Sequence, residues 1–405
     1  MSATKLFLLY ACLLLSACED SKPYWTAEHL KIIGSLSLSN LDQAPPTPSN
    51  RFANLDKAAS FGEQVFFDTR FSLNGKLSCA SCHQPDRAFT DGLITAKGIR
   101  TTNRNTQTII GAAYQTWFYW DGRKDSLWSQ ALVPFEAANE MASSRVKVLR
   151  TISRDRNLKQ QYEALFGKLP VSIFHKNIPE NAGPWGDART RDNWFRIPKS
   201  IQKQINSAYA NVGKAIGAYE RKIPIPKTRF DKYAEVLSIS GEQEASSLLN
   251  ENEKAGLSLF IDEKRTHCLR CHNGSLFSNG DFHNIGTGNL TGPQLDFGRY
   301  LGVQAVLQDE FNCMGNNSDA KPEECNALRF LPKEIHGELQ GAFKTPSIRY
   351  LNKTAPYFHD GRLSTVAEVL DHYTKKPSNG SELPDLSLTG EEKNQLIAFL
   401  ATLNY

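Results

Sequence analysis

The sequence predicts a mainly α-helical protein built from two similar halves, with few short strands. One observation is a repeated five-residue motif, since Cys79–His83 and Cys268–His272 both follow the pattern Cys-x-x-Cys-His. A second is that each motif follows a short segment with apolar residues at helical spacing, Gly62–Phe66 and Gly256–Phe260. A third is that strand-like alternation is sparse. We therefore expect two helical domains, each built around one copy of the motif.

This motif is typical of the attachment site of a c-type haem. The two thiols add to the vinyl groups of the porphyrin, and the histidine becomes the proximal ligand of the iron. The attaching cysteines would be Cys79, Cys82, Cys268 and Cys271, and the proximal ligands His83 and His272. The alternatives are chance or one half of a zinc site, but zinc needs four convergent ligands. We predict two cytochrome c-like domains with one covalent haem each.

The length and composition fit this division. The chain of 405 residues is long enough for two domains, which we expect over residues 51–235 and 236–405. A hydrophobic content of 40% and a charged content of 22% are those of a soluble globular protein. The net charge of +4 is too small to indicate nucleic-acid binding. Residues 200–221 are predicted to be helical, and residues 170–198 are predicted to form an inserted loop.

The N-terminal segment has the layout of an export signal. Lys5 precedes an apolar run over residues 6–15 that is too short to span a bilayer. The run ends in Leu-Ser-Ala-Cys, which resembles a bacterial lipobox, so we expect a signal peptide over residues 1–17 and a lipid on Cys18. The alternative is an ordinary signal peptide with an incidental cysteine. Residues 18–50 would then be a tether, and the protein would lie on the periplasmic side of a bacterial membrane.

Two further cysteines suggest a disulfide. Cys313 and Cys325 lie twelve residues apart in a polar stretch. A bond between them would close a surface loop and contribute about 3 kcal/mol on the loop-entropy model. Such a bond implies an oxidising compartment, which agrees with export. Two free thiols are the alternative.

Several ordered motifs, in addition to the haem sites, carry a family resemblance. After the first haem motif come Arg-Asn-Thr at 104–106, Trp-Asp-Gly-Arg at 120–123, Gln130, Pro134 and Glu-Met at 140–141. After the second come Phe-Lys-Thr-Pro-Ser at 343–347 and Thr-Ala-Pro-Tyr-Phe-His-Asp-Gly at 354–361, followed by a helix that ends at Tyr373. Over about residues 52–403 the chain resembles the bacterial di-haem cytochrome c peroxidase family, which includes MauG.

The resemblance implies that the first haem is the reactive one. A peroxidase needs an open coordination position and an acid or base that moves a proton between the peroxide oxygens. Classical members cap this iron with a histidine in the loop after the motif, but the loop over residues 86–104 contains Lys97 and no histidine. We therefore expect a five-coordinate first haem. Gln130 and Glu140 match the distal pair of the family, and Pro134 matches a proline that shapes the same pocket.

The second haem is expected to be closed by Tyr373. Thr365 and Glu368 form a capping box, and the helix that it opens carries Val366, Val369, Leu370 and Tyr373 on one stripe. Periodicity alone favours a core tyrosine. The resemblance instead matches Tyr373 to the sixth iron ligand, which is methionine in classical peroxidases and tyrosine in MauG. Because methionine raises the iron's potential, tyrosine favours storage of an oxidising equivalent over electron entry. His372 should face away.

Other matched positions imply a relay and a calcium site. Trp120 matches the tryptophan that lies between the two haems in the family. Asn105 and the carbonyl groups of Thr354 and Pro356 match the ligands of Ca²⁺, which prefers oxygen donors. In MauG a surface tryptophan precedes the second haem motif, whereas this chain has Thr266.

Three functions remain open from the sequence. The first is a di-haem peroxidase that reduces hydrogen peroxide with electrons from a periplasmic donor, with Glu140, Gln130, Trp120 and Pro134 at the active site. The second is a MauG- or MbnH-like enzyme that oxidises a residue of a partner protein through a bis-Fe(IV) state. The third, a plain electron carrier, is disfavoured by the open first haem.

Overall fold

The computed structural model describes residues 23–289, 295–332, 337–375 and 380–405. It is mainly helical, with one two-stranded antiparallel sheet among the described residues, which confirms the predicted fold class. The expected signal peptide over residues 1–17 and the lipidated Cys18 lie outside the described residues. Within the described part of the chain, no helix is long and apolar enough to cross a membrane.

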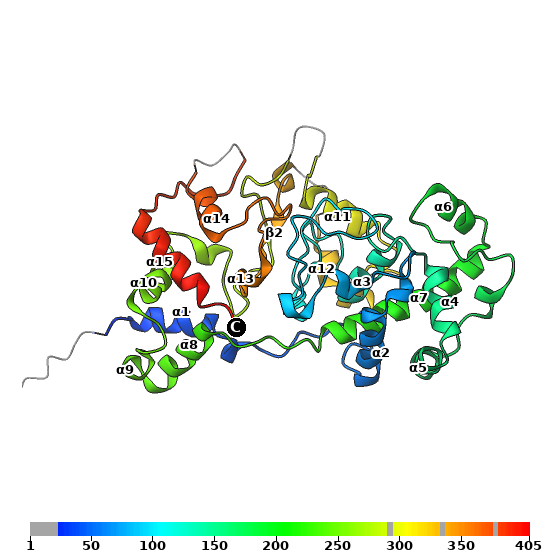
Figure 1. The fold of residues 1–405 in the computed structure, drawn as a ribbon, viewed down its shortest axis with the longest axis horizontal. Helices are drawn as coiled ribbons and strands as arrows, with labels where there is room; N and C mark the ends of the chain where they lie inside the picture. The colour runs from blue at the N-terminus through cyan, green and yellow to red at the C-terminus, as the bar shows by residue number, and fades with distance from the viewer. Residues whose placement is uncertain (1–22, 290–294, 333–336, 376–379) are drawn as a thin grey trace, which may run out of the picture.

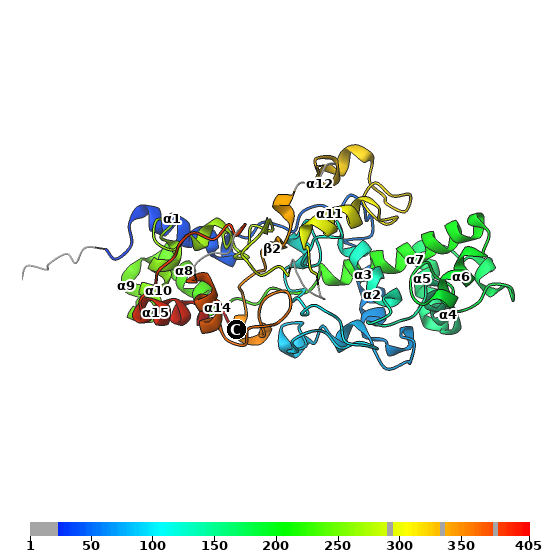
Figure 2. The ribbon, with the colours of Figure 1, turned by 90° about the horizontal axis from the view of Figure 1, so that it is seen from above.

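Two lobes lie next to one another along the long axis of the molecule (Figures 1 and 2). The first lobe contains α2 (Asp56–Phe67), α3 (Leu127–Glu136), α4 (Arg145–Arg154), α5 (Arg156–Phe166), α6 (Ala188–Phe195) and α7 (Lys199–Glu220). The second contains α1 (Ala27–Leu36), α8 (Arg229–Ser240), α9 (Glu242–Ala245), α10 (Glu251–Ile261), α13 (Leu351–Thr354), α14 (Val366–Tyr373) and α15 (Gly390–Ala401). Between them lie α11 (Arg299–Leu307), α12 (Asn326–Arg329) and the strands β1 (Phe282–His283) and β2 (Phe343–Lys344), in which Phe282 pairs with Lys344.

The same helix crossing organises both lobes. In the first, Gly62 of α2 lies against the backbone of α7 at Ala215, and in the second, Gly256 of α10 lies against the backbone of α15 at Gln395. A Cβ atom at either glycine would collide with the facing carbonyl group. The two backbones can therefore approach closely only because glycine has no side chain. The repeat seen in the sequence thus corresponds to a repeated packing contact.

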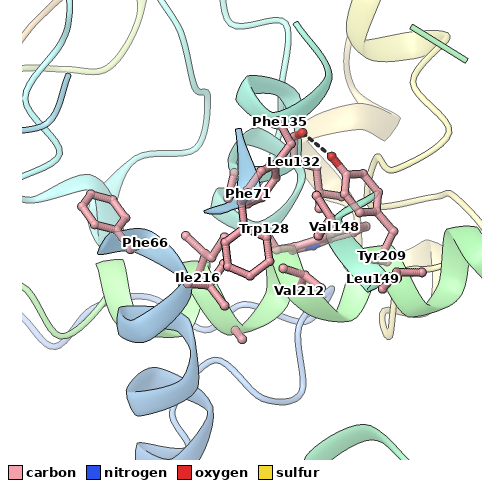
Figure 3. Packing of buried hydrophobic residues seen from close by; sticks show 14 of the residues in the cluster. Phe66, Phe71, Trp128, Leu132, Phe135, Val148, Leu149, Tyr209, Val212 and Ile216 are labelled. Carbon is pink, nitrogen blue, oxygen red and sulfur yellow. Dashed lines mark hydrogen bonds between the residues drawn. The ribbon is translucent and has the colours of Figure 1, made fainter. Parts of the chain in front are cut away.

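Each lobe has its own apolar core. The first core is built on the faces of α3 and α7, with Trp128, Phe135 and Ile216 fully or almost fully buried (Figure 3). The Tyr209 hydroxyl satisfies its hydrogen-bonding need by donating to the Leu132 carbonyl at 2.6 Å. The second core is formed by aromatic and aliphatic side chains that include Phe230, Leu257, Phe260, Phe277 and Phe399.

The structure differs from the expected tether over residues 18–50. Residues 27–36 form α1, which packs on the second core through Ile33 and Leu36. Trp25 is 2% exposed, and its indole nitrogen donates a hydrogen bond to the Tyr233 hydroxyl at 2.6 Å. Because this segment contains many polar residues, its short amphipathic helix was not predicted. The helix gains stability by burying one face.

A segment from the C-terminal half packs on the first lobe. Phe311 is buried in the first core, and Asp309 accepts a hydrogen bond from the Lys124 ammonium at 2.6 Å. Cys313 and Cys325 are joined by a disulfide within this segment. The first lobe is therefore not a continuous stretch of chain. The predicted helix over residues 200–221 corresponds to α7.

Candidate haem sites

The first motif presents its ligating groups on a short 3-10 turn. Cys79 and Cys82 are free thiols, and the His83 Nδ1 donates a hydrogen bond to the Phe89 carbonyl at 3.0 Å. This bond assigns the proton to Nδ1 and leaves Nε2 free to bind a metal. Burial lowers the pKa of His83, which favours the neutral imidazole that ligation requires. Phe89 has a φ of 58°, so a left-handed backbone turns its carbonyl group toward the ring.

The second motif repeats this arrangement. The His272 Nδ1 donates to the Phe277 carbonyl at 3.0 Å, and Phe277 has a φ of 52°. Burial again lowers the pKa of the histidine. Cys268 and Cys271 are free thiols that line a cavity of about 380 Å³ together with His272. Two thiols, an oriented imidazole and an apolar cavity fit a covalently attached haem.

The distal residues named from the sequence meet in one small cavity of the first lobe. Gln130 and Pro134 come from α3, and Glu140 comes from the loop that follows it. All three line a cavity of about 50 Å³ with His83 and the two thiols. The Glu140 carbonyl accepts a hydrogen bond from the Ile99 amide at 2.7 Å, which anchors the loop. Burial raises the pKa of the Glu140 carboxyl, and Arg123 opposes that rise.

Tyr373 shares the larger cavity with the second motif. It occupies the last turn of α14, whose capping box of Thr365 and Glu368 is present in the structure. The side chains of Cys268, Cys271, His272 and Tyr373 line the same 380 Å³ cavity. Burial raises the pKa of the Tyr373 phenol. The neighbouring His372 does not line the cavity, and its Nε2 donates a hydrogen bond to the Ile285 carbonyl at 2.7 Å.

Trp120 and the three expected calcium ligands also line the larger cavity. The Trp120 indole nitrogen donates to the Asn105 carbonyl at 3.0 Å, and the Asn105 side-chain amide donates to the Leu93 carbonyl at 2.8 Å. Thr354 and Pro356 contribute from α13 and the turn after it. No group of three or more His, Cys, Asp or Glu side chains within the described residues could hold a metal ion, so a calcium site here would depend on amide and carbonyl oxygens.

Sequence reasoning missed several buried polar groups at these sites. Lys344 is buried in the larger cavity, burial lowers its pKa to about 7, and its ammonium donates to the Gln115 side chain. A buried ammonium with only an amide as partner suits a carboxylate of a bound haem. Glu220 lines the smaller cavity, and one of its oxygens is buried without a hydrogen-bond partner among the described residues. The Tyr119 hydroxyl is likewise buried, and burial raises its pKa.

A second repeated sequence motif indicates a turn that the two lobes share. Trp-Asp-Gly-Arg at 120–123 repeats as His-Asp-Gly-Arg at 359–362. In both copies the arginine pairs with the aspartate. The residue before each copy has a left-handed backbone, with a φ of 69° at Tyr119 and 70° at Phe358. The two lobes therefore share this turn as well as the haem motif, and aligning the copies locates equivalent positions.

The paired motifs, the repeated helix crossing and the shared turn define a di-haem c-type cytochrome fold. Comparison with known proteins agrees. Residues 56–237 match the family model described as di-haem cytochrome c peroxidase. The methylamine utilization protein MauG of Methylorubrum extorquens is 28% identical over 367 residues, which cover 89% of this chain and 82% of that protein. Cytochrome-c peroxidase IdrP2 of Denitromonas iodatirespirans is 29% identical over 360 residues, which cover 88% of this chain and 84% of that protein.

Solved structures show the same fold. A MauG-like protein associated with microbial copper homeostasis superimposes with a TM-score of 0.61 and 24% identity, covering 90% of this chain and 95% of that one. The diheme peroxidase BthA from Burkholderia thailandensis superimposes with a TM-score of 0.62 and 19% identity, covering 90% and 89%. Over residues 56–237 the chain therefore resembles the di-haem cytochrome c peroxidase family, and relatives named MauG and cytochrome-c peroxidase align with 89% and 88% of it.

Proposed function

We propose that the protein reduces hydrogen peroxide at the haem held by His83, while the haem held by His272 and Tyr373 retains the second oxidising equivalent. The observation that carries this proposal is the convergence of Gln130, Pro134 and Glu140 in the cavity of the first motif. A haem bound there supplies an iron that can accept peroxide and exchange electrons.

The residues of the first cavity have separate tasks in this proposal. His83 holds its ring in one tautomer through Phe89. The Glu140 carboxyl, with its pKa raised by burial, takes a proton from the peroxide oxygen nearer the iron and returns it to the leaving oxygen. The Gln130 amide donates a hydrogen bond that orients the peroxide. Pro134 would leave the coordination position of the iron open, because its ring carries no group that could bind the iron. Trp120 provides a route toward the second cavity.

Oxidation of a partner protein is the second candidate, and the position of Tyr373 in the second cavity favours it. A phenolate ligand stabilises an oxidised iron better than a thioether does. Thr266 stands where MauG has the surface tryptophan of its electron-transfer route, which argues against that route here. The Thr266 hydroxyl is buried and donates to the Leu259 carbonyl at 2.6 Å. A peroxidase should turn over rapidly with a small cytochrome donor, whereas a modifying enzyme should leave a covalent mark on its partner.

The remaining sequence-based expectations extend the proposal. We propose a Ca²⁺ ion bound by Asn105, Thr354 and Pro356, export to the periplasm, and a lipid anchor at Cys18. The electron donor or protein substrate would then be a periplasmic protein. We place the domain boundary near residue 235 on sequence grounds, although Phe230 and Tyr233 already pack on the second core.

Replacement of Glu140 by glutamine tests the peroxidase proposal. We expect Glu140→Gln to slow the reaction of the ferric holoprotein with peroxide by about 10²- to 10⁴-fold, the usual range for loss of a general acid–base group, with unchanged haem content. Stopped-flow absorbance measures this rate. The matched control is Glu63→Gln, which makes the same change on the exposed face of α2. An unaltered rate in Glu140→Gln would remove this residue from the mechanism.

A further inference from the structure

Tyr219 belongs to a group of aromatic rings that extends from the first haem site to the surface. Phe66, near the end of α2, lines the cavity of His83. The centre of its ring lies 6.5 Å from that of the His83 imidazole and 5.1 Å from that of the Tyr219 ring. The adjacent Phe67 is 42% exposed and lies 6.1 Å from Tyr219, which is itself partly exposed. Two steps from ring to ring therefore connect the expected iron ligand with solvent.

The second lobe contains the same pair of rings in a closed form. At the positions equivalent to Phe66 and Tyr219, found by counting along each helix from the crossing, it has Phe260 and Phe399. Their ring centres lie 5.2 Å apart, so the packing of the pair is retained. Phe399 is fully buried, Phe260 is 3% exposed, and Phe230 of α8 packs against Phe399 at 5.7 Å. The first lobe thus differs at this place by a hydroxyl group and by access to solvent.

The Tyr219 hydroxyl is not needed for the packing of the rings, because Phe399 makes the same contact without one. Burial raises the pKa of the Tyr219 phenol to about 12, so the phenol is protonated at neutral pH and must release its proton when it is oxidised. A phenol loses an electron far more readily than a benzene ring does. Tyr219 is therefore the oxidisable residue of this group, and Phe66 can only bridge the distance to the haem site. Trp120 leads toward the second cavity, whereas Tyr219 leads to solvent.

We propose that Tyr219 is a redox-active residue through which the first haem site oxidises small phenols at the surface. The inference deepens the proposed peroxidase function and rests on it. After hydrogen peroxide has oxidised the haem site, Tyr219 gives it one electron across Phe66, and the phenol O–H bond breaks as its proton passes to water. A phenol stacked on the exposed Phe67 ring then gives one electron and one proton to the Tyr219 oxygen and leaves as a phenoxyl radical. Two such cycles supply the two electrons and release the two protons that reduction of one peroxide to water consumes.

Spin trapping followed by peptide mapping tests this route. The ferric holoprotein receives hydrogen peroxide together with 2-methyl-2-nitrosopropane, and mass spectrometry of the digest locates the covalent adduct, which we expect on Tyr219. Tyr219→Phe should lose this adduct and most of the oxidation of guaiacol, a small phenol, by the same holoprotein. Its haem content, thermal stability and stopped-flow rate of reaction with peroxide should equal those of the wild type, since Phe399 fits the equivalent position.

Tyr114→Phe is the matched control, because Tyr114 is also partly exposed and its hydroxyl donates to the Asp42 carbonyl at 3.0 Å. This variant should keep both the adduct on Tyr219 and the oxidation of guaiacol. Reaction of the wild type with peroxide without an adduct on Tyr219, or oxidation of guaiacol by Tyr219→Phe at the wild-type rate, would overturn the surface route and leave the peroxidase function intact. Absence of any reaction between peroxide and the ferric holoprotein would overturn both proposals together.

Discussion

The two lobes contain the same cytochrome unit with different side chains at a few equivalent positions. Both have the glycine-mediated helix crossing, the histidine hydrogen-bonded to a phenylalanine carbonyl, and the Asp-Gly-Arg turn. Twelve residues after the glycine of that turn, the first lobe has Pro134 and the second has Tyr373. Each of these lines the cavity of its own haem motif. Proline offers no donor atom to an iron, whereas a phenol does, so in the proposed function this one difference would separate an open site from a closed one.

A second difference lies on the long helices. Counting five residues from Ala215 in α7 and from Gln395 in α15, the two contact points of the crossing, leads to Glu220 and Leu400. Both residues line the cavities of their lobes. Packing alone would favour an apolar residue, such as Leu400, at a buried position of this kind. At these two equivalent positions the first lobe therefore has buried polar groups, Glu220 and Tyr119, where the second has Leu400 and Phe358.

Removal of the Tyr373 hydroxyl should have the largest effect of these predictions, because it should abolish the difference between the two haem sites. We expect Tyr373→Phe to leave the second iron without a sixth protein ligand, so the high-spin ferric signal of the holoprotein should rise from one haem to two. Electron paramagnetic resonance measures this. Tyr357→Phe is the matched control, because Tyr357 lines the same cavity and its hydroxyl donates to the Leu351 carbonyl at 3.0 Å. An unchanged spectrum in Tyr373→Phe would show that Tyr373 is not a ligand.

Substitutions at the helix crossings should be smaller in effect and specific to one lobe. Gly62→Ala and Gly256→Ala each place a methyl group against a facing backbone carbonyl, and such overpacking typically costs about 1–3 kcal/mol. Denaturant unfolding, followed through the absorbance of each haem, should show the loss in the lobe that carries the change. Gly390→Ala, whose Cβ would meet nothing within 4 Å, should remain close to wild type. Equal losses in all three variants would argue against the crossing as the cause.

The smallest predicted effect concerns Glu220. Burial raises its pKa from 4.5 to about 8, so between these values the folded protein binds more protons than the unfolded chain. Stability should therefore fall as pH rises across this window. Glu220→Leu and Glu220→Gln should both remove this slope, and Glu220→Leu should gain about 1 kcal/mol at pH 8 because no orphaned carboxyl remains. Melting temperatures measured from pH 4 to pH 9 decide the matter, and parallel curves for the wild type and both variants would contradict it.

The sequence alone determined the number of lobes, their helical class and the residues that could attach two haems. These depend on local patterns, because a thiol pair with its histidine, a glycine at a helix contact and a capping box each lie within a few residues. Even the equivalence of Pro134 and Tyr373 in the two lobes can be inferred from the repeated Asp-Gly-Arg sequence. The helix over residues 27–36, inside the tether expected over residues 18–50, could not be predicted because its apolar face becomes identifiable only from the core that it covers.

Only the tertiary structure decided which distant groups share a cavity. Asp309 and Phe311 come from the C-terminal half yet pack on the first lobe, and no local pattern encodes such a contact. The same holds for the buried polar groups of Tyr119 and Glu220, because a polar residue in a helix or turn is not unusual until its burial is known. Burial and the absence of a partner are properties of the whole packed chain, since each depends on residues that approach from far along the sequence.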